Sequence, residues 1–359
     1  MAYTSPLHDV HVRLGAKVTG FGGWDMPLAY EGVIAEHLAV RKQVGLFDVT
    51  HLGKILVSGL DASDLLDRAL PGKVAELADW TAGYNLVLDS NGGIIDDVFV
   101  YRTPDNFLIV PNAANFDSVM SFLAGKILEH ETQVDLEDAR MRWAILALSG
   151  PQSREVVGRM TPELANMKMH TFSESASDGL RLLVARTGYT GEVTFEYFVD
   201  WALAPELWER LFRAGESFGI KPAGLGARDT LRLEMGYPLH GHDIDTTTNP
   251  IEAGLGWLIQ WDKAFDSKRL LETLRSEGPR RKLVGLIAES RRFPRQHAEI
   301  SRDGEKVGEV TSGNFSPILE QGIALGYVDA ASSEVGTELI VDVRGKELPM
   351  HVKKPPFKP

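Results

Sequence analysis

Residues 84–101, YNLVLDSNGGIIDDVFVY, decide the fold class of this chain. The β-rich runs Tyr84–Leu88 and Asp97–Tyr101 flank the turn sequence Ser90-Asn91-Gly92-Gly93. Asn-Gly between two such runs is a strong β-hairpin signal, because both residues tolerate the positive φ angles of a tight turn. Helical and strand patterns elsewhere are grouped rather than regularly alternating. This grouping favours an α+β fold over a doubly wound parallel sheet.

Helical patterns lie on both sides of the hairpin. Segments with an apolar stripe run from Glu31 to Val44 and from Ala204 to Phe218,. Asp61 and Asn115 are each expected to cap the start of a further helix. From about residue 280 the pattern changes to short β-rich runs separated by turns, which predicts a small all-β barrel or roll. These runs are Leu283–Ile287, Val307–Thr311, Ile323–Val328, Leu339–Val343 and Leu348–Val352.

Length and composition indicate a globular protein of more than one domain. The 359 residues are too many for one ordinary core, so two or three domains are expected,. No apolar stretch approaches the roughly 18–20 residues that a membrane span requires. The first residues lack a basic segment followed by an apolar one, so a secretory signal or an Arg-rich transit peptide is not expected. We expect a cytoplasmic protein, although a trimmed protein of the mitochondrial matrix would look the same.

The absence of cysteine excludes several kinds of site. Disulfides, thiolate zinc sites, iron–sulfur ligation and a cysteine nucleophile all require residues that the chain lacks,. The net charge of −12 argues against an extended nucleic-acid surface,. Gly224-Leu225-Gly226 lacks the third glycine of a dinucleotide loop, and His240-Gly241-His242 lacks a third metal ligand,. We therefore expect neither a metal nor a nucleotide cofactor.

Two adjacent acids, Asp96 and Asp97, stand where the hairpin turn passes into an apolar strand. Neighbouring residues on a strand point to opposite faces, so the two acids are expected to do different jobs. An acid in an apolar run costs free energy unless it is hydrogen-bonded or lies in a polar site. The pattern alone leaves two interpretations open, a solvated turn and a pocket carboxylate.

A second acid stands on a strand that follows a glycine-containing loop. Arg186–Glu192 has glycines spaced three apart, as in a tight loop whose backbone approaches a ligand,. The alternation after it puts Glu196 on the face opposite to Phe195 and Tyr197. An exposed strand position is the commoner explanation for such a residue.

A third segment, Gly224–Glu234, predicts a helix that begins after two glycines. Amides at its start are able to bind an anion or a carbonyl. Arg228, in the first turn, offers a rigid fork of donors.

Taken together, these segments resemble the glycine cleavage T-protein (aminomethyltransferase) family from end to end. No single block is decisive, but their joint order and spacing span nearly the whole chain. The matching blocks are Phe21–Pro27, Gly45–His51, Gly92–Asp97, Arg186–Glu192, Gly224–Glu234 and Thr311–Pro317.

The resemblance implies a cloverleaf of three domains around a central folate pocket. Residues 1–52 and 145–279 would form a discontinuous folate-binding core, residues 53–144 an α+β domain, and residues 280–359 a β-barrel or jelly-roll-like domain. In the family reaction, the lipoylated H protein of the glycine cleavage system delivers an aminomethyl group. Tetrahydrofolate accepts the carbon, and ammonia and the reduced lipoyl arm are released.

The resemblance also implies roles for individual residues. Asp96 matches the family's first acid, and we assign it the catalytic role of orienting the folate amine and stabilising positive charge, with Asp97 structural. Glu196 matches the acid that grips the pterin, whose adjacent N–H donors a carboxylate can accept in pairs. Arg228 matches an arginine near the folate. The remaining pocket-lining positions are Tyr84, Val110, Asn112, Tyr189 and Leu52.

Departures from the family pattern fall near this pocket. The family usually has Met where Leu52 stands, Gly where Thr194 stands and Asn where Pro111 stands. Two alternatives stay open. One is a folate-dependent demethylase of a small methylated amine or sulfonium on the same scaffold. The other is a non-enzymatic folate-binding assembly factor, although those relatives carry a Lys-Gly-Cys-Tyr type of motif and this chain has no cysteine.

Overall fold

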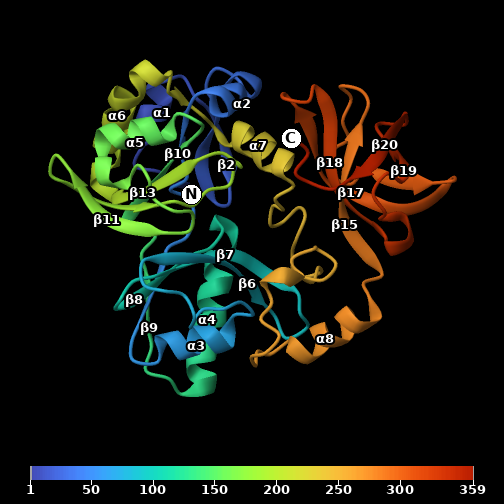
Figure 1. Ribbon diagram of the computed structural model, residues 1–359, viewed down its shortest axis with the longest axis horizontal. Coiled ribbons are helices and arrows are strands. Elements are labelled where there is room, and N and C mark those ends of the chain that lie inside the picture. The colour runs from blue at the N-terminus through green and yellow to red at the C-terminus, as the bar shows by residue number, and fades with distance from the viewer. Residues whose placement is uncertain (1, 359) are drawn as a thin grey trace. The chain divides into compact units, whose positions relative to one another are not determined.

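The computed structural model describes residues 2–358 (Figure 1). These residues divide into two compact units. The first unit contains residues up to 87 and residues 96–228, and the second contains residues 88–95 and those from 229 onward. Each unit has its own sheets and core. The three-domain division expected from the family resemblance stays a prediction.

A six-stranded sheet in the first unit has the strand order β11-β12-β13-β10-β4-β14. Its neighbours pair antiparallel except β14 and β4, which are parallel. The strands are β4 (Gly45–Asp48), β10 (Trp143–Ser149), β11 (Phe172–Ser177), β12 (Leu180–Ala185), β13 (Thr194–Asp200) and β14 (Lys221–Pro222). The helices of this part are α1 (His8–Arg13), α2 (Val33–Lys42), α5 (Ser153–Met160) and α6 (Ala204–Gly215).

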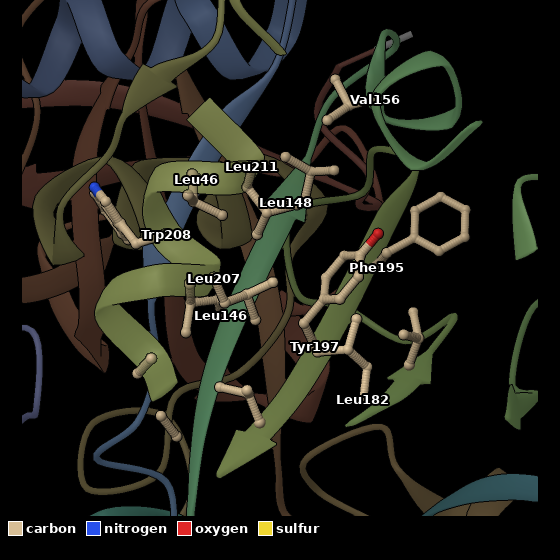
Figure 2. Packing of buried hydrophobic residues seen from close by; sticks show 14 of the residues in the cluster. Leu46, Leu146, Leu148, Val156, Leu182, Phe195, Tyr197, Leu207, Trp208 and Leu211 are labelled. Carbon is tan, nitrogen blue, oxygen red and sulfur yellow. The ribbon is translucent and has the colours of Figure 1, made fainter. Parts of the chain in front are cut away.

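The core of this sheet lies on the face covered by α6. Leu207, Trp208 and Leu211 recur at helical spacing, which gives α6 one apolar side,. Figure 2 shows Leu207 and Leu211 directed toward the leucines of β10, and Trp208 belongs to the same buried cluster, as does Tyr197 of β13. Fully burying each large apolar side chain contributes roughly 1.5–3 kcal/mol. Because side chains alternate along a strand, the opposite face of β13 presents Thr194, Glu196 and Phe198,.

Two smaller sheets complete the first unit. A five-stranded sheet has the order β6-β7-β8-β5-β9, and a three-stranded sheet has the order β1-β3-β2. The strands are β1 (Tyr3–Thr4), β2 (Lys17–Phe21), β3 (Trp24–Ala29), β5 (Ile55–Ser58), β6 (Thr81–Leu88), β7 (Ile94–Arg102), β8 (Asn106–Val110) and β9 (Asp135–Asp138). Helices α3 (Ala62–Ala69) and α4 (Phe116–His130) accompany the larger of these sheets. The expected hairpin is therefore present as neighbouring strands β6 and β7.

The second unit contains a closed barrel with the strand order β15-β18-β17-β16-β19-β20. The strands are β15 (Arg281–Ala288), β16 (Glu299–Arg302), β17 (Glu305–Ser316), β18 (Gln321–Asp329), β19 (Glu338–Asp342) and β20 (Glu347–Lys353). Helix α8 (Lys268–Glu277) precedes the barrel, and α7 (Leu225–Met235) begins in the first unit and continues into the second. The α+β class and the C-terminal β domain are thus confirmed, and that domain closes as a barrel.

Two expected helix caps are wrong. The Asp61 side chain makes no cap hydrogen bond to α3 and instead accepts a hydrogen bond from the Gln133 amide at 2.8 Å. The Asn115 side chain likewise leaves the start of α4 uncapped, and its amide group points to Asp96. In both cases the side chain bonds to a group that is distant in the sequence instead of to the first turn of its own helix.

Among the residues that the structure describes, no helix combines the length and the apolar character needed to cross a bilayer.

Candidate active site

A row of side chains along one face of β7 begins at Asp97. The Tyr84 hydroxyl of β6 donates to Asp97 Oδ2 at 2.9 Å, and the Tyr84 ring centroid lies 5.6 Å from that of Phe99. The Phe99 ring in turn lies 6.1 Å from the ring of Tyr101. Val110 is the cross-strand partner of Phe99 and therefore stands on the same face,. This face is only half-buried at Asp97 and Phe99.

The row ends at Glu196 on β13. The Tyr101 hydroxyl donates to Glu196 Oε2 at 3.3 Å, and the Thr187 hydroxyl donates to the same oxygen. Within residues 2–358, no hydrogen bond reaches the other oxygen, Oε1. Glu196 is 8% exposed, so the explanation of a solvent-facing strand position does not hold. Oε1 is not one of the fully buried polar atoms that lack a partner, so it keeps some accessible surface and a ligand can reach it with a donor,.

Arg228 lies beside Glu196 and Tyr189. Its guanidinium carbon is 5.0 Å from the centroid of the Tyr189 ring, which is a cation–π distance,. Burial lowers the pKa of Arg228 below its usual value, and the negative charge of Glu196 opposes that change. Burial also raises the pKa of the Tyr84 hydroxyl, with further contributions from Asp97 and Tyr189. These interactions place Tyr84 and Tyr189 in one electrostatic environment.

The start of α7 is fixed by a carboxylate of the protein itself. Glu36, which is 2% exposed, accepts hydrogen bonds from the amides of Tyr30, Gly32 and Gly224 at 2.6, 2.9 and 2.8 Å. A side chain at Gly224 would meet the Leu28 carbonyl at 2.4 Å, so only glycine fits. The Gly224 amide, which the sequence offered as a possible anion donor, is therefore already occupied.

Asp96 points to the opposite face of β7 and is 0% exposed. It accepts hydrogen bonds from the Asn112 amide at 2.9 Å, from Asn112 Nδ2 at 2.8 Å and from Asn115 Nδ2 at 2.7 Å. Asn112 Nδ2 also lies 2.9 Å from Asp97 Oδ1, so this side chain joins the two acids. Burial, with help from the Asp97 charge, raises the pKa of Asp96 to about 8, although the Asn112 and Asn115 donors oppose the rise.

The surroundings of the two acids therefore differ from those that their expected roles require. Asp96, expected to be catalytic, is enclosed by asparagine donors. Asp97, expected to be structural, faces the aromatic row that leads to Glu196. The strand pattern predicted opposite faces but not which face carries the site.

Other expected and unexpected residues can also be placed. Leu52 is half-buried in the turn after β4, and among the described residues no hydrogen bond or ring contact joins it to the group around Glu196. Tyr101 and Thr187 were not predicted from the sequence as site residues, although Tyr101 lies on the same face of its strand as Asp97,. The His51 ring packs edge-on against Phe21, with the two ring centroids 5.4 Å apart. Burial and then the Arg228 charge lower the pKa of His51 to about 3, so it is neutral at pH 7.

The pKa of Asp96 leads to a testable prediction about stability. The folded pKa exceeds the value of about 3.9 for an unfolded chain, so the folded state binds more protons between these values,. The stabilising contribution is complete below about pH 4 and is lost as pH rises through about 8,. We expect the free energy of unfolding of the wild type, minus that of Asp96→Asn, to fall between pH 5 and pH 8. The slope cannot exceed about 1.4 kcal/mol per pH unit. Urea titrations across this range measure it, and a flat or rising difference would contradict the prediction.

No group of three or more His, Asp and Glu side chains is arranged to hold a metal ion in the part of the chain that the structure describes. The chemistry available here comes from a half-buried carboxylate, a buried carboxylate with an unpaired oxygen, a guanidinium and several aromatic rings. Such a set suits a flat ligand that stacks on the aromatic rings and donates N–H groups to one carboxylate. The other carboxylate is then able to stabilise a positive charge that develops during a reaction.

Comparisons with known proteins match the chain over almost its whole length. Residues 7–263 match the family described as "GCVT N-terminal domain", and residues 281–358 match "Glycine cleavage T-protein C-terminal barrel domain". The chain is 44% identical over 360 residues to the aminomethyltransferase of Frankia alni, which covers 99% of this chain and 97% of that protein. It is 41% identical over 362 residues to the aminomethyltransferase of Bacteroides fragilis, covering 99% of each.

A solved structure agrees with these relatives. The crystal structure of glycine cleavage system aminomethyltransferase T from Bartonella henselae matches with a TM-score of 0.93 and 35% sequence identity. The match covers 99% of this chain and 98% of that one.

Proposed function

The chain belongs to the glycine cleavage T-protein family of aminomethyltransferases, and we propose that its substrates are tetrahydrofolate and an aminomethyl group on a lipoylated partner protein. The family resemblance inferred from the sequence is thereby confirmed, as is the enzyme class. The relatives give no support to the demethylase or to the assembly factor.

The observation that carries the folate proposal is the unpaired Oε1 of Glu196. Thr187 and Tyr101 satisfy Oε2, which leaves Oε1 to accept a hydrogen bond from a ligand. The aminopyrimidinone edge of a pterin presents adjacent N–H donors, and charge-assisted bonds to a carboxylate are roughly twice as strong as neutral ones. Arg228 and Tyr189 lie beside this carboxylate and would contact the ring system.

We assign the reacting end of the site to Asp97 rather than to Asp96. Asp97 is half-buried on the face that carries Tyr84 and Phe99, so it can approach a substrate that stacks along this row. Asp96 has no exposed surface and acts through Asn112, which binds both acids. In this assignment Asp97 is catalytic, and Asp96 is a positioning residue.

The reaction that these residues serve balances without an oxidant or a metal. The transferred carbon loses its bonds to the lipoyl sulfur and to the amino nitrogen and gains bonds to two folate nitrogens. Of the two protons displaced from the folate nitrogens, one goes to sulfur and one goes to the departing ammonia. Positive charge develops on the carbon as its leaving groups depart. A fixed carboxylate in a site of reduced polarity stabilises that charge more than water does.

Release of ammonia tests this function directly. We expect the purified protein to release ammonia from an aminomethylated lipoyl partner much faster when tetrahydrofolate is present than when it is absent. The second arm of the experiment supplies small methylated amines and sulfonium compounds with the same folate. Turnover in that arm alone would replace the proposal with a demethylase.

A further inference from the structure

The loop between β12 and β13 holds two of the residues in the proposed folate site. Thr187 donates to Glu196, and Tyr189 packs against Arg228. We propose that three buried hydroxyl groups, those of Ser149, Thr190 and Thr194, position this loop and thereby set the affinity for folate. We call these three groups the hydroxyl ring. The inference rests on the proposed function, because the ligand whose affinity it concerns is tetrahydrofolate.

The hydroxyl ring is compact and shielded from water. Ser149 on β10 and Thr194 on β13 are direct cross-strand partners, and their hydroxyl oxygens lie 2.7 Å apart. Ser149 Oγ lies 2.6 Å from Thr190 Oγ1, and the two threonine oxygens lie 3.3 Å apart. The three residues are at most 2% exposed. Hydroxyls so placed depend on one another, because no water competes for their protons.

Both ends of the hydroxyl ring are tied to the Glu192 backbone. The Glu192 amide donates to Thr190 Oγ1 at 3.1 Å, and the Thr194 hydroxyl donates to the Glu192 carbonyl at 3.2 Å. If Thr190 donates to Ser149 and Ser149 donates to Thr194, each hydroxyl donates one proton and accepts one,. The chain of bonds then starts and finishes at one residue, which fixes the path of the loop between Thr190 and Thr194.

Thr194 also supports the loop by direct contact. A Cβ atom on Gly188 would lie 2.4 Å from Thr194 Cβ, so the Thr194 side chain packs directly against the backbone that precedes Tyr189. Arg41 holds the other side of the loop, with Nη1 2.7 Å from the Thr190 carbonyl and 2.8 Å from Glu192 Oε1.

The first test removes one hydroxyl and keeps the side-chain shape. In Thr194→Val, the Ser149 hydroxyl loses its hydrogen-bond acceptor. The loop is then no longer held in one path, and Tyr189 is no longer held in position. We expect the dissociation constant for tetrahydrofolate, measured by calorimetry without oxygen, to rise about tenfold. The value of kcat at saturating folate is expected to change by about twofold or less, since none of the three hydroxyls belongs to the Asp97 end.

Two further variants make this result specific. Thr194→Ser keeps the hydroxyl and is expected to recover most of the lost affinity. Thr132→Val makes the same chemical change at a buried hydroxyl that has no hydrogen-bond partner among residues 2–358, and it should leave folate affinity at the wild-type value. Wild-type affinity in Thr194→Val, or equal losses in Thr194→Val and Thr194→Ser, would overturn the inference.

A double-mutant cycle shows whether the hydroxyl ring acts through Tyr189. In a Tyr189→Ala background, Thr194→Val is expected to change folate affinity by no more than about twofold, because the side chain that it positions is already gone. An additional tenfold loss in that background would mean that the hydroxyl acts elsewhere, and the inference would fail.

Hydrogen exchange separates this inference from the proposed function. Thr194→Val is expected to speed exchange of the Glu192 amide, whereas Thr194→Ser is not, whether or not a ligand is present. If the wild type does not bind tetrahydrofolate, the proposed function fails, and the exchange result still decides whether the hydroxyl ring orders the loop. If the wild type binds folate and exchange is unchanged in Thr194→Val, only the inference fails.

Discussion

Replacement of Asp97 by asparagine is expected to lower kcat for aminomethyl transfer by on the order of 10²–10³-fold, while the affinity for tetrahydrofolate changes little. Asparagine keeps the size of the side chain and an oxygen that can accept from the Tyr84 hydroxyl, which lies 2.9 Å from the carboxylate. What it removes is the negative charge beside the reacting carbon. Single-turnover measurements with saturating folate and an aminomethylated partner isolate this step.

Asp96→Asn is the matched control, because it makes the same change in the neighbouring residue. Asp96 is enclosed by Asn112 and Asn115, so we expect a much smaller loss of kcat. The two variants also decide between the assignments. Near-normal turnover in Asp97→Asn together with a large loss in Asp96→Asn would return the catalytic role to Asp96.

Replacement of Glu196 by alanine is expected to weaken tetrahydrofolate binding by about 100-fold, because hydrogen bonds to a charged group contribute roughly 1.5–3 kcal/mol. The variant removes the unpaired oxygen and also leaves the hydroxyls of Thr187 and Tyr101 without their acceptor. Calorimetry measures the change, and kcat at saturating folate should fall much less.

Asp200→Asn is a suitable control for this variant. Asp200 lies at the exposed end of the same strand, so the substitution removes a negative charge from β13 outside the site. We expect folate affinity to stay at the wild-type value. Equal affinities in the wild type and Glu196→Ala would remove Glu196 from the binding site.

Strand alternation explains how much of the site could be predicted from the sequence. It correctly put Asp96 and Asp97 on opposite faces and Glu196 on the face opposite to the Phe195 and Tyr197 core. It could not say which face of β7 carries the site, because that depends on strands and loops far away in the sequence. Tyr101 and Thr187 were missed for the same reason. They are far apart in the sequence, and their hydroxyl groups meet only in the folded structure.

The fold was predicted where local pattern is strong. The hairpin turn and the short, regularly spaced strands after residue 280 were sufficient for the antiparallel pairing and the C-terminal β domain. Helix α8 was missed, and Leu271 is its one buried residue among those described, so its apolar stripe is narrow. The caps at Asp61 and Asn115 failed because tertiary partners, a loop amide and the Asp96 carboxylate, took the side chains that a local rule assigns to the helix.

The anchoring of α7 by Glu36 constrains how this protein can vary during evolution. Arg228 stands one helical turn after Gly224, with its amide donating to the Gly224 carbonyl at 3.1 Å. Each residue of an α-helix advances the side-chain direction by about 100°, since there are about 3.6 residues per turn. A residue gained or lost between these two positions would therefore swing the guanidinium away from Tyr189 while the anchor stayed in place. Length in this segment should drift far less among descendants of this chain than length in its surface turns.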